Sequence, residues 1–134
     1  MYTNTIATLY NKYVESHETL YKRTVLDSVH WEGLQGVASI RLGNIDSNSV
    51  LVSIPFSVNV KNNIFVKNKA FEALVNKNGY YTFNANDVIV KGEIPDSVEF
   101  EELEGSYDDV ITIESVNTAD YGSLRMRHWE ILGK

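Results

Sequence analysis

The chain has 134 residues, of which 43% are hydrophobic and 22% charged, and its formal net charge at pH 7 is −6. This length and composition are typical of one soluble globular domain and exclude a disordered chain. The acidic balance counts against a general binder of polyanions, which normally carries a basic surface. Cysteine is absent, which excludes disulfides, thiolate nucleophiles and cysteine-based zinc sites and fits synthesis in a reducing cytoplasm.

Short β-type runs separated by turn residues dominate the first part of the sequence. Runs at about Thr5–Val14 and about Leu20–Trp31 flank the polar turn SHET, so we expect them to form a hairpin. Two further strands are predicted at Val37–Leu42 and Ser49–Phe56, joined by the turn-rich segment GNIDSNS. Pro55 predicts an edge strand or a strand end, because proline cannot donate a backbone hydrogen bond.

The middle of the chain lacks the alternation of a strand. Within about Lys69–Lys77, the apolar residues Phe71, Leu74 and Val75 recur at helical spacing, and a glycine follows shortly after. This pattern predicts one short helix that follows an exposed basic loop. Loop and helix together form a long insertion at about residues 57–79.

β signals resume after the insertion, in YYTF, Asp87–Ile94, Val110–Val116 and the C-terminal run YGSLRMRHWEILGK. Between them, about residues 95–109 are predicted to be an acidic loop with at most one irregular strand or turn. Residues 1–134 therefore form a single mainly β domain. We expect a small antiparallel β-barrel or sandwich of about seven or eight strands with one short helix and a long inserted loop.

The C-terminal run is the least regular of the predicted strands. It places RMRHWE at residues 125–130, and on a regular strand neither face would be cleanly apolar. Leu124 begins an apolar face that Trp129 does not continue. A bulge near Arg127 or His128 would reconcile the two faces by switching them partway along the strand.

Charged residues are unevenly placed along the chain. From Lys61 to Lys77 there are four lysines and one acid, whereas from Glu93 to Asp109 there are eight acids and no base. Two solvated loops of opposite sign explain this pattern, and so does charge complementarity between copies in an assembly. The candidate basic residues are Lys61, Lys67, Lys69 and Lys77. The candidate acidic surface consists of Glu99, Glu101, Glu102, Glu104, Asp108 and Asp109.

No pattern specifies a catalytic, cofactor or metal site. The dipeptides at His30-Trp31 and His128-Trp129 lack metal-site spacing. Because side chains alternate along a strand, each histidine and its tryptophan lie on opposite faces. We expect each tryptophan to lie in a core or interface and each histidine to face solvent or a hydrogen-bond partner. GxSxG, GxxxxGK[ST] and GxGxxG are all absent. No apolar run approaches the ~18 residues of a membrane span, and MYTNTIATLYNKY does not resemble a signal peptide. We therefore expect no enzyme, no cofactor and no membrane partner.

The order of several motifs is more informative than any one of them. VHWEG comes first, then IPFS, then a short helix with KNGYYTFNANDVIVKGEI, and finally YDDVITIESVNTADYGSLRMRHWEILGK. This order resembles small proteins encoded among the head-morphogenesis genes of tailed bacteriophages of Gram-positive hosts. These proteins look like minor capsid or head-closure (stopper) proteins. DVIVKG and YGSLRMRHW are the most specific parts of the resemblance.

The resemblance implies a non-enzymatic virion structural protein of the head–tail connector. Such a protein is a small β-barrel with an inserted loop, forming a ring of about 6 or 12 copies below the portal and adaptor. The ring closes the head, retains DNA and docks the tail. The implied partners are copies of the chain, portal and adaptor proteins, a tail-completion or tail-tube protein and the packaged DNA. The implied location is the virion neck, after synthesis in the host bacterial cytoplasm.

On this resemblance, the basic insertion faces neighbouring subunits or DNA, and the acidic segment contacts an adjacent subunit, the adaptor or the tail. The C-terminal strand carries a partner-facing side with Arg125, Arg127 and Trp129. Two alternatives remain open. One is a tail-completion or tail-terminator protein. The other, from a different class, is a monomeric β-barrel that binds a small ligand or single-stranded nucleic acid through its many aromatic residues.

Overall fold

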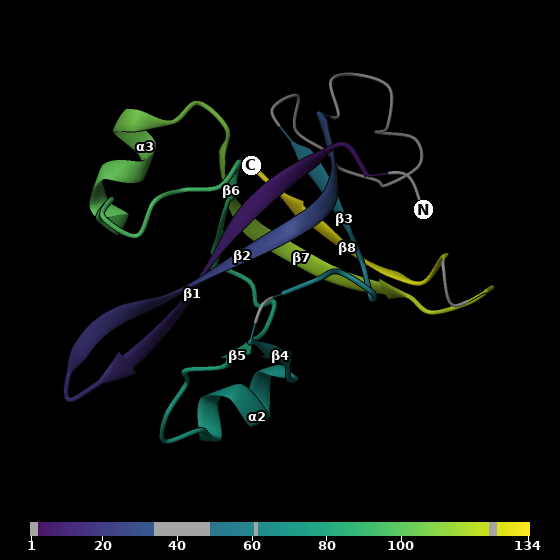
Figure 1. The fold of residues 1–134 in the computed structure, drawn as a ribbon. Helices are drawn as coiled ribbons and strands as arrows, with labels where there is room; N and C mark the ends of the chain where they lie inside the picture. Colours follow the sequence, from purple (N-terminus) through teal and green to yellow (C-terminus); the bar gives the residue numbers. More distant parts are fainter. Residues whose placement is uncertain (1–2, 34–48, 61, 124–125) are drawn as a thin grey trace.

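A closed barrel of six strands, in the order β1-β2-β3-β8-β7-β6, forms the centre of the computed structural model (Figure 1). All neighbouring strands of the barrel pair antiparallel. The structure describes residues 3–33, 49–60, 62–123 and 126–134. The barrel strands are β1 (Thr5–Glu15), β2 (Glu18–Gly33), β3 (Val50–Pro55), β6 (Val88–Lys91), β7 (Val110–Ala119) and β8 (His128–Gly133). The predicted mainly β fold, the antiparallel barrel and the first hairpin are confirmed.

Two segments leave the barrel and form lobes on its outside. The inserted lobe, residues 57–87 between β3 and β6, contains β4 (Ile64–Phe65), α2 (Asn68–Ala73) and β5 (Tyr80–Tyr81). Its two short strands pair parallel to each other. The acidic lobe, residues 92–109 between β6 and β7, contains the 3₁₀ helix η1 (Phe100–Glu102) and α3 (Leu103–Ser106). The acidic segment is thus partly helical where the sequence predicted a loop, because it buries Leu103 against the barrel.

The helix of the inserted lobe is shorter than predicted. It begins at Asn68 and ends at Ala73, since Leu74 already has an extended backbone. Of the three apolar residues that suggested a helix to Lys77, only Phe71 is buried, and Val75 is 99% exposed. The spacing of apolar residues therefore predicted a helix that is about one turn too long at its C-terminal end.

The strand predicted at Val37–Leu42 lies outside the described residues. Pro55 is the last residue of β3, so the predicted strand end is confirmed. The bulge predicted near Arg127 or His128 is wrong, because β8 begins only at His128 and then alternates regularly. The irregularity is in its partner instead, where the β7–β8 register shifts between Ile113 and Ser115.

The barrel interior is filled by aliphatic and aromatic side chains from all six strands and from the inserted lobe. A second, smaller core of Tyr10, Val90, Ile94 and Leu103 lies under the acidic lobe. Trp31 and Trp129 are each only 7% exposed and belong to the main core. The lobes are therefore fixed to the barrel by buried contacts.

Gly133 is predicted to be intolerant of a side chain, because it lies against the backbone of β7. A Cβ at this position would lie 2.5 Å from the Thr112 carbonyl oxygen. Two backbone hydrogen bonds between Thr112 and Lys134, of 3.1 and 3.3 Å, hold the strands at this separation. We expect Gly133→Ala to lower the free energy of unfolding by about 1–3 kcal/mol, measured by urea denaturation.

Gly105→Ala is the matched control for this variant. Gly105 lies in α3, and a Cβ there would meet nothing within 4 Å. Its substitution should leave the free energy of unfolding unchanged or raise it by at most about 1 kcal/mol. Equal urea midpoints for the two variants would contradict the close approach at Gly133.

Candidate interaction surfaces

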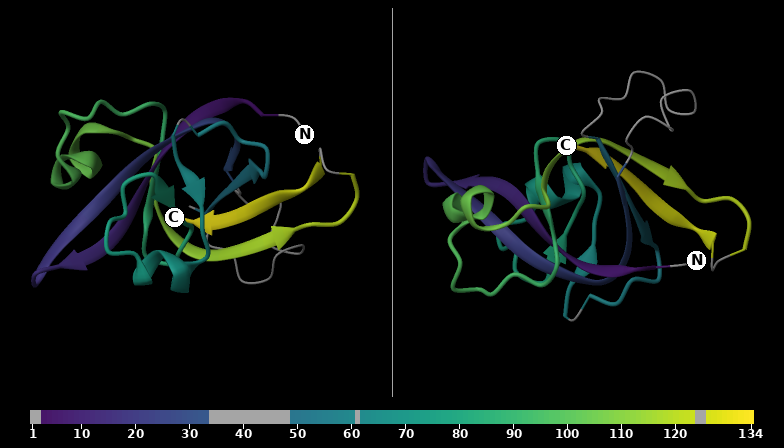
Figure 2. Two further views of the ribbon diagram at one scale, coloured as in Figure 1. Left: turned by 60° about the horizontal axis from the view of Figure 1, so that its bottom comes forward. Right: turned by 90° about the horizontal axis from the view of Figure 1, so that it is seen from above.

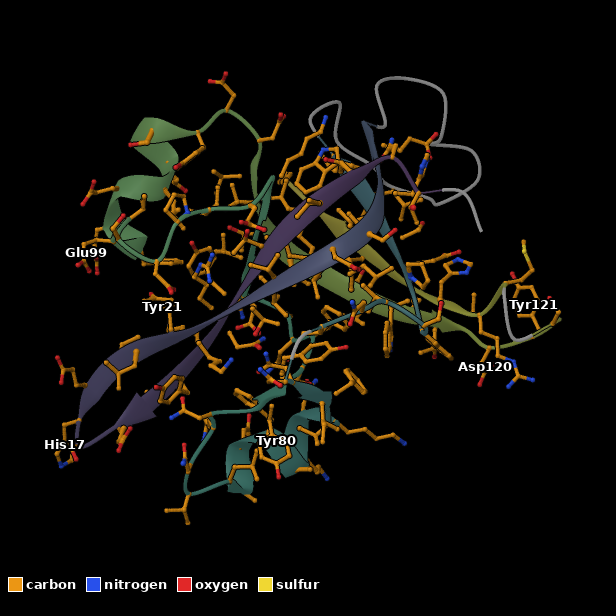
Figure 3. The ribbon with its side chains drawn as sticks, viewed as in Figure 1. His17, Tyr21, Tyr80, Glu99, Asp120 and Tyr121 are labelled. Atoms are coloured by element: carbon orange, nitrogen blue, oxygen red, sulfur yellow. The ribbon has the colours of Figure 1, made fainter. Side chains whose placement is uncertain are left out.

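The hairpin of β1 and β2 extends well beyond the barrel (Figure 1). This happens because β6 pairs only with Ala7–Tyr10 of β1, and β3 pairs only with His30–Gly33 of β2. The two strands continue to pair with each other to their ends. Ser16 and His17 at the tip both have positive φ, as a tight two-residue turn with a right-handed strand twist requires. His17 marks this tip in Figure 3.

The two lobes lie on opposite faces of this hairpin. Tyr13 belongs to one cross-strand pair and Tyr21 to the next, and consecutive pairs present their side chains to opposite faces. The Lys77 ammonium of the inserted lobe lies 5.3 Å from the centroid of the Tyr13 ring. Phe100 of the acidic lobe stacks on Tyr21 with 3.5 Å between ring centroids. Figure 1 and the left view of Figure 2 show one lobe on each side of the hairpin.

Hydrogen bonds and one ion pair fix the acidic lobe to β1 and β2. Nε of Arg23 donates to the Ile94 carbonyl at 2.8 Å, and its Nη1 lies 3.2 Å from Oδ1 of Asp96. The Thr8 hydroxyl donates to the Gly92 carbonyl at 2.7 Å and accepts from the Ile94 N–H at 3.0 Å. The lobe is therefore held in one position relative to the hairpin.

All of the predicted acidic surface is exposed on this lobe. These residues are Glu99, Glu101, Glu102, Glu104, Asp108 and Asp109. Figure 3 shows Glu99 at the outer side of the lobe. None of the six forms an ion pair within the part of the chain that the structure describes. The lobe thus presents uncompensated negative charge to its surroundings.

Asn11 fixes the inserted lobe to the barrel and is fully buried. Its side-chain Nδ2 donates to the Thr82 carbonyl at 2.7 Å and to Oδ2 of Asp87 at 2.8 Å. Its Oδ1 accepts from the Thr82 N–H at 3.3 Å, and Oδ1 of Asp87 accepts from the Lys12 N–H at 3.1 Å. Sequence reasoning missed this cluster, for which a single asparagine inside the run ATLYNKY was the only signal.

Asp87 predicts a pH dependence of stability. Burial raises the pKa of its carboxyl above the ordinary value of 3.8, against the hydrogen bonds from Asn11 and Lys12, which lower it. The folded chain therefore keeps this proton to higher pH than the unfolded chain. The contribution of Asp87 to the free energy of unfolding is full below the unfolded pKa and is lost as pH rises through the folded pKa.

This dependence can be measured as a difference between the wild type and Asp87→Asn, which cannot titrate. Urea midpoints from about pH 4 to pH 7 should show the advantage of the wild type shrinking as pH rises. The substitution also places the side-chain amide of residue 87 beside Nδ2 of Asn11, which in the wild type donates to Oδ2 of Asp87. This change adds a loss of stability that does not depend on pH. A constant difference across the range would contradict the raised pKa.

The structure separates the predicted basic residues. Lys67 and Lys69 are exposed at the start of α2. Lys77 is half-buried, and its ammonium donates to the Leu74 carbonyl at 2.9 Å while lying 5.3 Å from the Tyr13 and Phe71 ring centroids. Its charge therefore serves the attachment of the inserted lobe. Lys61 lies outside the described residues.

Trp129 corrects the expectation of an interface on the C-terminal strand. It points into the barrel, with 4.6 Å from its ring centroid to that of Phe56 and 4.6 Å to that of Phe65. Regular alternation from the start of β8 sends its side chain inward. Arg127 is half-buried just before the strand, and Arg125 lies outside the described residues.

The histidines beside the two tryptophans face away from the core, as predicted. His128 contacts Oε1 of Glu130 at 3.1 Å and the Met126 carbonyl at 2.7 Å. Within the described ranges, no group of three or more His, Cys, Asp or Glu residues is placed to hold a metal ion. No helix in the same ranges is long and apolar enough to cross a membrane. The arrangement therefore exposes a strongly acidic surface on one lobe, and Lys67 and Lys69 together with Glu72 on the other.

Comparison with known proteins matches the chain to a family. The model of a family of unknown function (DUF6751) matches residues 2–134. The matched range takes in the barrel, the inserted lobe and the acidic lobe together. No curated protein and no solved structure matches the chain.

Proposed function

The chain belongs to the family of unknown function DUF6751, and we propose that it is a non-enzymatic structural protein of the bacteriophage neck. In this role it is a head–tail connector component that forms a ring below the portal and adaptor. The ring closes the head, retains the packaged DNA and docks the tail. The ordered motifs described above motivate the proposal, and the placement of the two lobes supports it.

The observation that carries the proposal is the opposite charge of lobes on opposite faces of one hairpin. A ring built from identical chains needs two different surfaces on each chain, because every copy contacts its neighbours head to tail. Here the acidic lobe supplies one surface, and Lys67 and Lys69 on the inserted lobe supply the other. Because the hairpin separates the lobes, these charges face neighbouring molecules and fix the register of docking.

Reversing the lysines of the inserted lobe tests the role of that lobe. We expect the triple variant Lys61→Glu, Lys67→Glu and Lys69→Glu to keep the fold, because the two described lysines are exposed. Assembly of phage particles should drop by at least about tenfold, since like charges then meet at the docking surface. The measurement is the yield of tailed particles when the variant replaces the wild-type protein during infection.

Lys91→Glu is the control, since Lys91 is an exposed lysine on β6, outside the inserted lobe. It should leave the yield unchanged. Normal closure of heads and joining of tails with the triple variant would contradict the role assigned to the inserted lobe. Salt-sensitive binding of a fluorescent single-stranded oligonucleotide by the isolated monomer would favour the nucleic-acid-binding alternative instead.

A further inference from the structure

A hollow of ≈ 420 Å³ lies between the β1–β2 hairpin and the acidic lobe. Three aromatic residues line it, namely Tyr10, Tyr21 and Phe100, of which Tyr10 is buried and the others are half-buried. Three exposed glutamates, Glu18, Glu99 and Glu101, line it as well. Figure 3 shows Tyr21 and Glu99 on the same side of the molecule, where the hairpin meets the lobe. The hollow therefore combines aromatic surface with carboxylates.

The negative charge of this hollow is not balanced from within. Arg23 also lines it, but its guanidinium donates to the Ile94 carbonyl and pairs with Asp96. Glu18, Glu99 and Glu101 form no ion pair with any described residue. A positively charged group placed here would gain attraction from carboxylates that have no other partner.

The Tyr10 hydroxyl is a second sign of a missing ligand. Tyr10 is 4% exposed, and its hydroxyl oxygen is buried without a hydrogen-bond partner among the described residues. The guanidinium of Arg23 lies near this hydroxyl, donates to the Ile94 carbonyl and pairs with Asp96. A buried polar atom without a partner is unfavourable, and a bound N–H donor would satisfy it.

We propose that this hollow binds an arginine side chain of a partner protein. A guanidinium group stacks on aromatic rings and donates in a planar fork to carboxylates, so arginine suits this lining better than lysine does. A second copy does not offer such a group within its described residues. There, Arg23 is held by the acidic lobe, and Arg127 is half-buried. The inference stands without the neck role proposed above.

Binding can be tested by NMR on the full-length chain with the tripeptide acetyl-Gly-Arg-Gly-amide as the probe. We expect amide shifts centred on Tyr21, Glu99 and Phe100 that saturate at millimolar peptide. The matching citrulline peptide has the same shape without the charge and should produce no such shifts. The double variant Glu99→Gln and Glu101→Gln should weaken binding about fivefold, since each exposed charge pair contributes modestly.

The double variant Glu102→Gln and Glu104→Gln is the matched control, since it removes the same charge from the same lobe outside the lining of the hollow. It should change the dissociation constant less than about twofold. Tyr10→Phe removes only the hydroxyl and should weaken binding as well. Equal binding of the citrulline peptide, or no shifts near the hollow, would overturn the proposal. Shifts at these residues on raising the protein concentration alone would assign the hollow to a second copy and overturn it too.

Discussion

We expect the replacement of Asn11 by alanine to lower the free energy of unfolding by about 3–4 kcal/mol, a loss that urea denaturation would measure. The substitution removes three hydrogen bonds and leaves the N–H and carbonyl of Thr82 and Oδ2 of Asp87 without this partner. Each buried polar group left unsatisfied contributes about 1–3 kcal/mol of destabilisation. The effect approaches the largest values seen for single substitutions, because one fully buried amide serves two elements at once.

Asn117→Ala is the control for this prediction, since Asn117 is an exposed asparagine within β7. Its substitution should change the free energy of unfolding by at most about 0.5 kcal/mol. In Asn11→Ala the amide of Thr82 should also exchange its hydrogen much faster, because the inserted lobe loses its attachment. Equal effects of the two substitutions would mean that the buried cluster does not hold the lobe.

Trp129→Ala is predicted to lower the free energy of unfolding by about 3–5 kcal/mol, since it removes one of the two tryptophan side chains of the main core. Its ring lies 4.6 Å from that of Phe65 and 5.0 Å from that of Phe83, measured between centroids. Both of these residues belong to the inserted lobe, so the cavity would open where the lobe joins the barrel. Thermal unfolding followed by circular dichroism measures the loss.

The control for this variant is Tyr121→Ala, at the end of the β7–β8 hairpin, where the side chain is 76% exposed. Its effect should stay within about 0.5 kcal/mol. Figure 3 shows Tyr121 far from the barrel interior. A loss below about 1 kcal/mol for Trp129→Ala would contradict the place of Trp129 in the core.

Local patterns predicted the barrel strands well, because alternation and turn residues act over a few positions. The hairpin of β1 and β2, the strand end at Pro55 and the outward histidines all follow from such patterns. The side on which Trp129 lies does not follow. Both faces of the C-terminal run carry polar and apolar residues, and only closure of the barrel makes one of them the inside.

The lobes depend on contacts between distant residues, so their details were not predictable from local patterns. Asn11 and Asp87 are 76 positions apart, and nothing near either residue indicates the other. The acidic segment becomes helical because it packs on the hairpin, where Tyr21 meets Phe100. The sequence pattern predicted that Lys77 belongs to a basic surface. In the structure its ammonium lies 5.3 Å from the ring centroids of both Tyr13 and Phe71.

The charge pattern, by contrast, was visible in the sequence and gains meaning from the structure. The predicted acidic residues are all exposed, and Lys67 and Lys69 are exposed on the other lobe. What the sequence could not indicate is that the hairpin lies between the two lobes. This arrangement places the acidic residues and these two lysines on opposite faces of the hairpin.

The most direct test of the proposed role is to locate the protein in purified phage particles. Mass spectrometry of the particles should detect it, and cryo-electron microscopy of the neck should show its barrel repeated in a ring between portal and tail. The same map should place the acidic lobe of each copy against a neighbouring chain. Absence of the protein from the particles would contradict the role in the neck and favour a barrel that acts as a monomer.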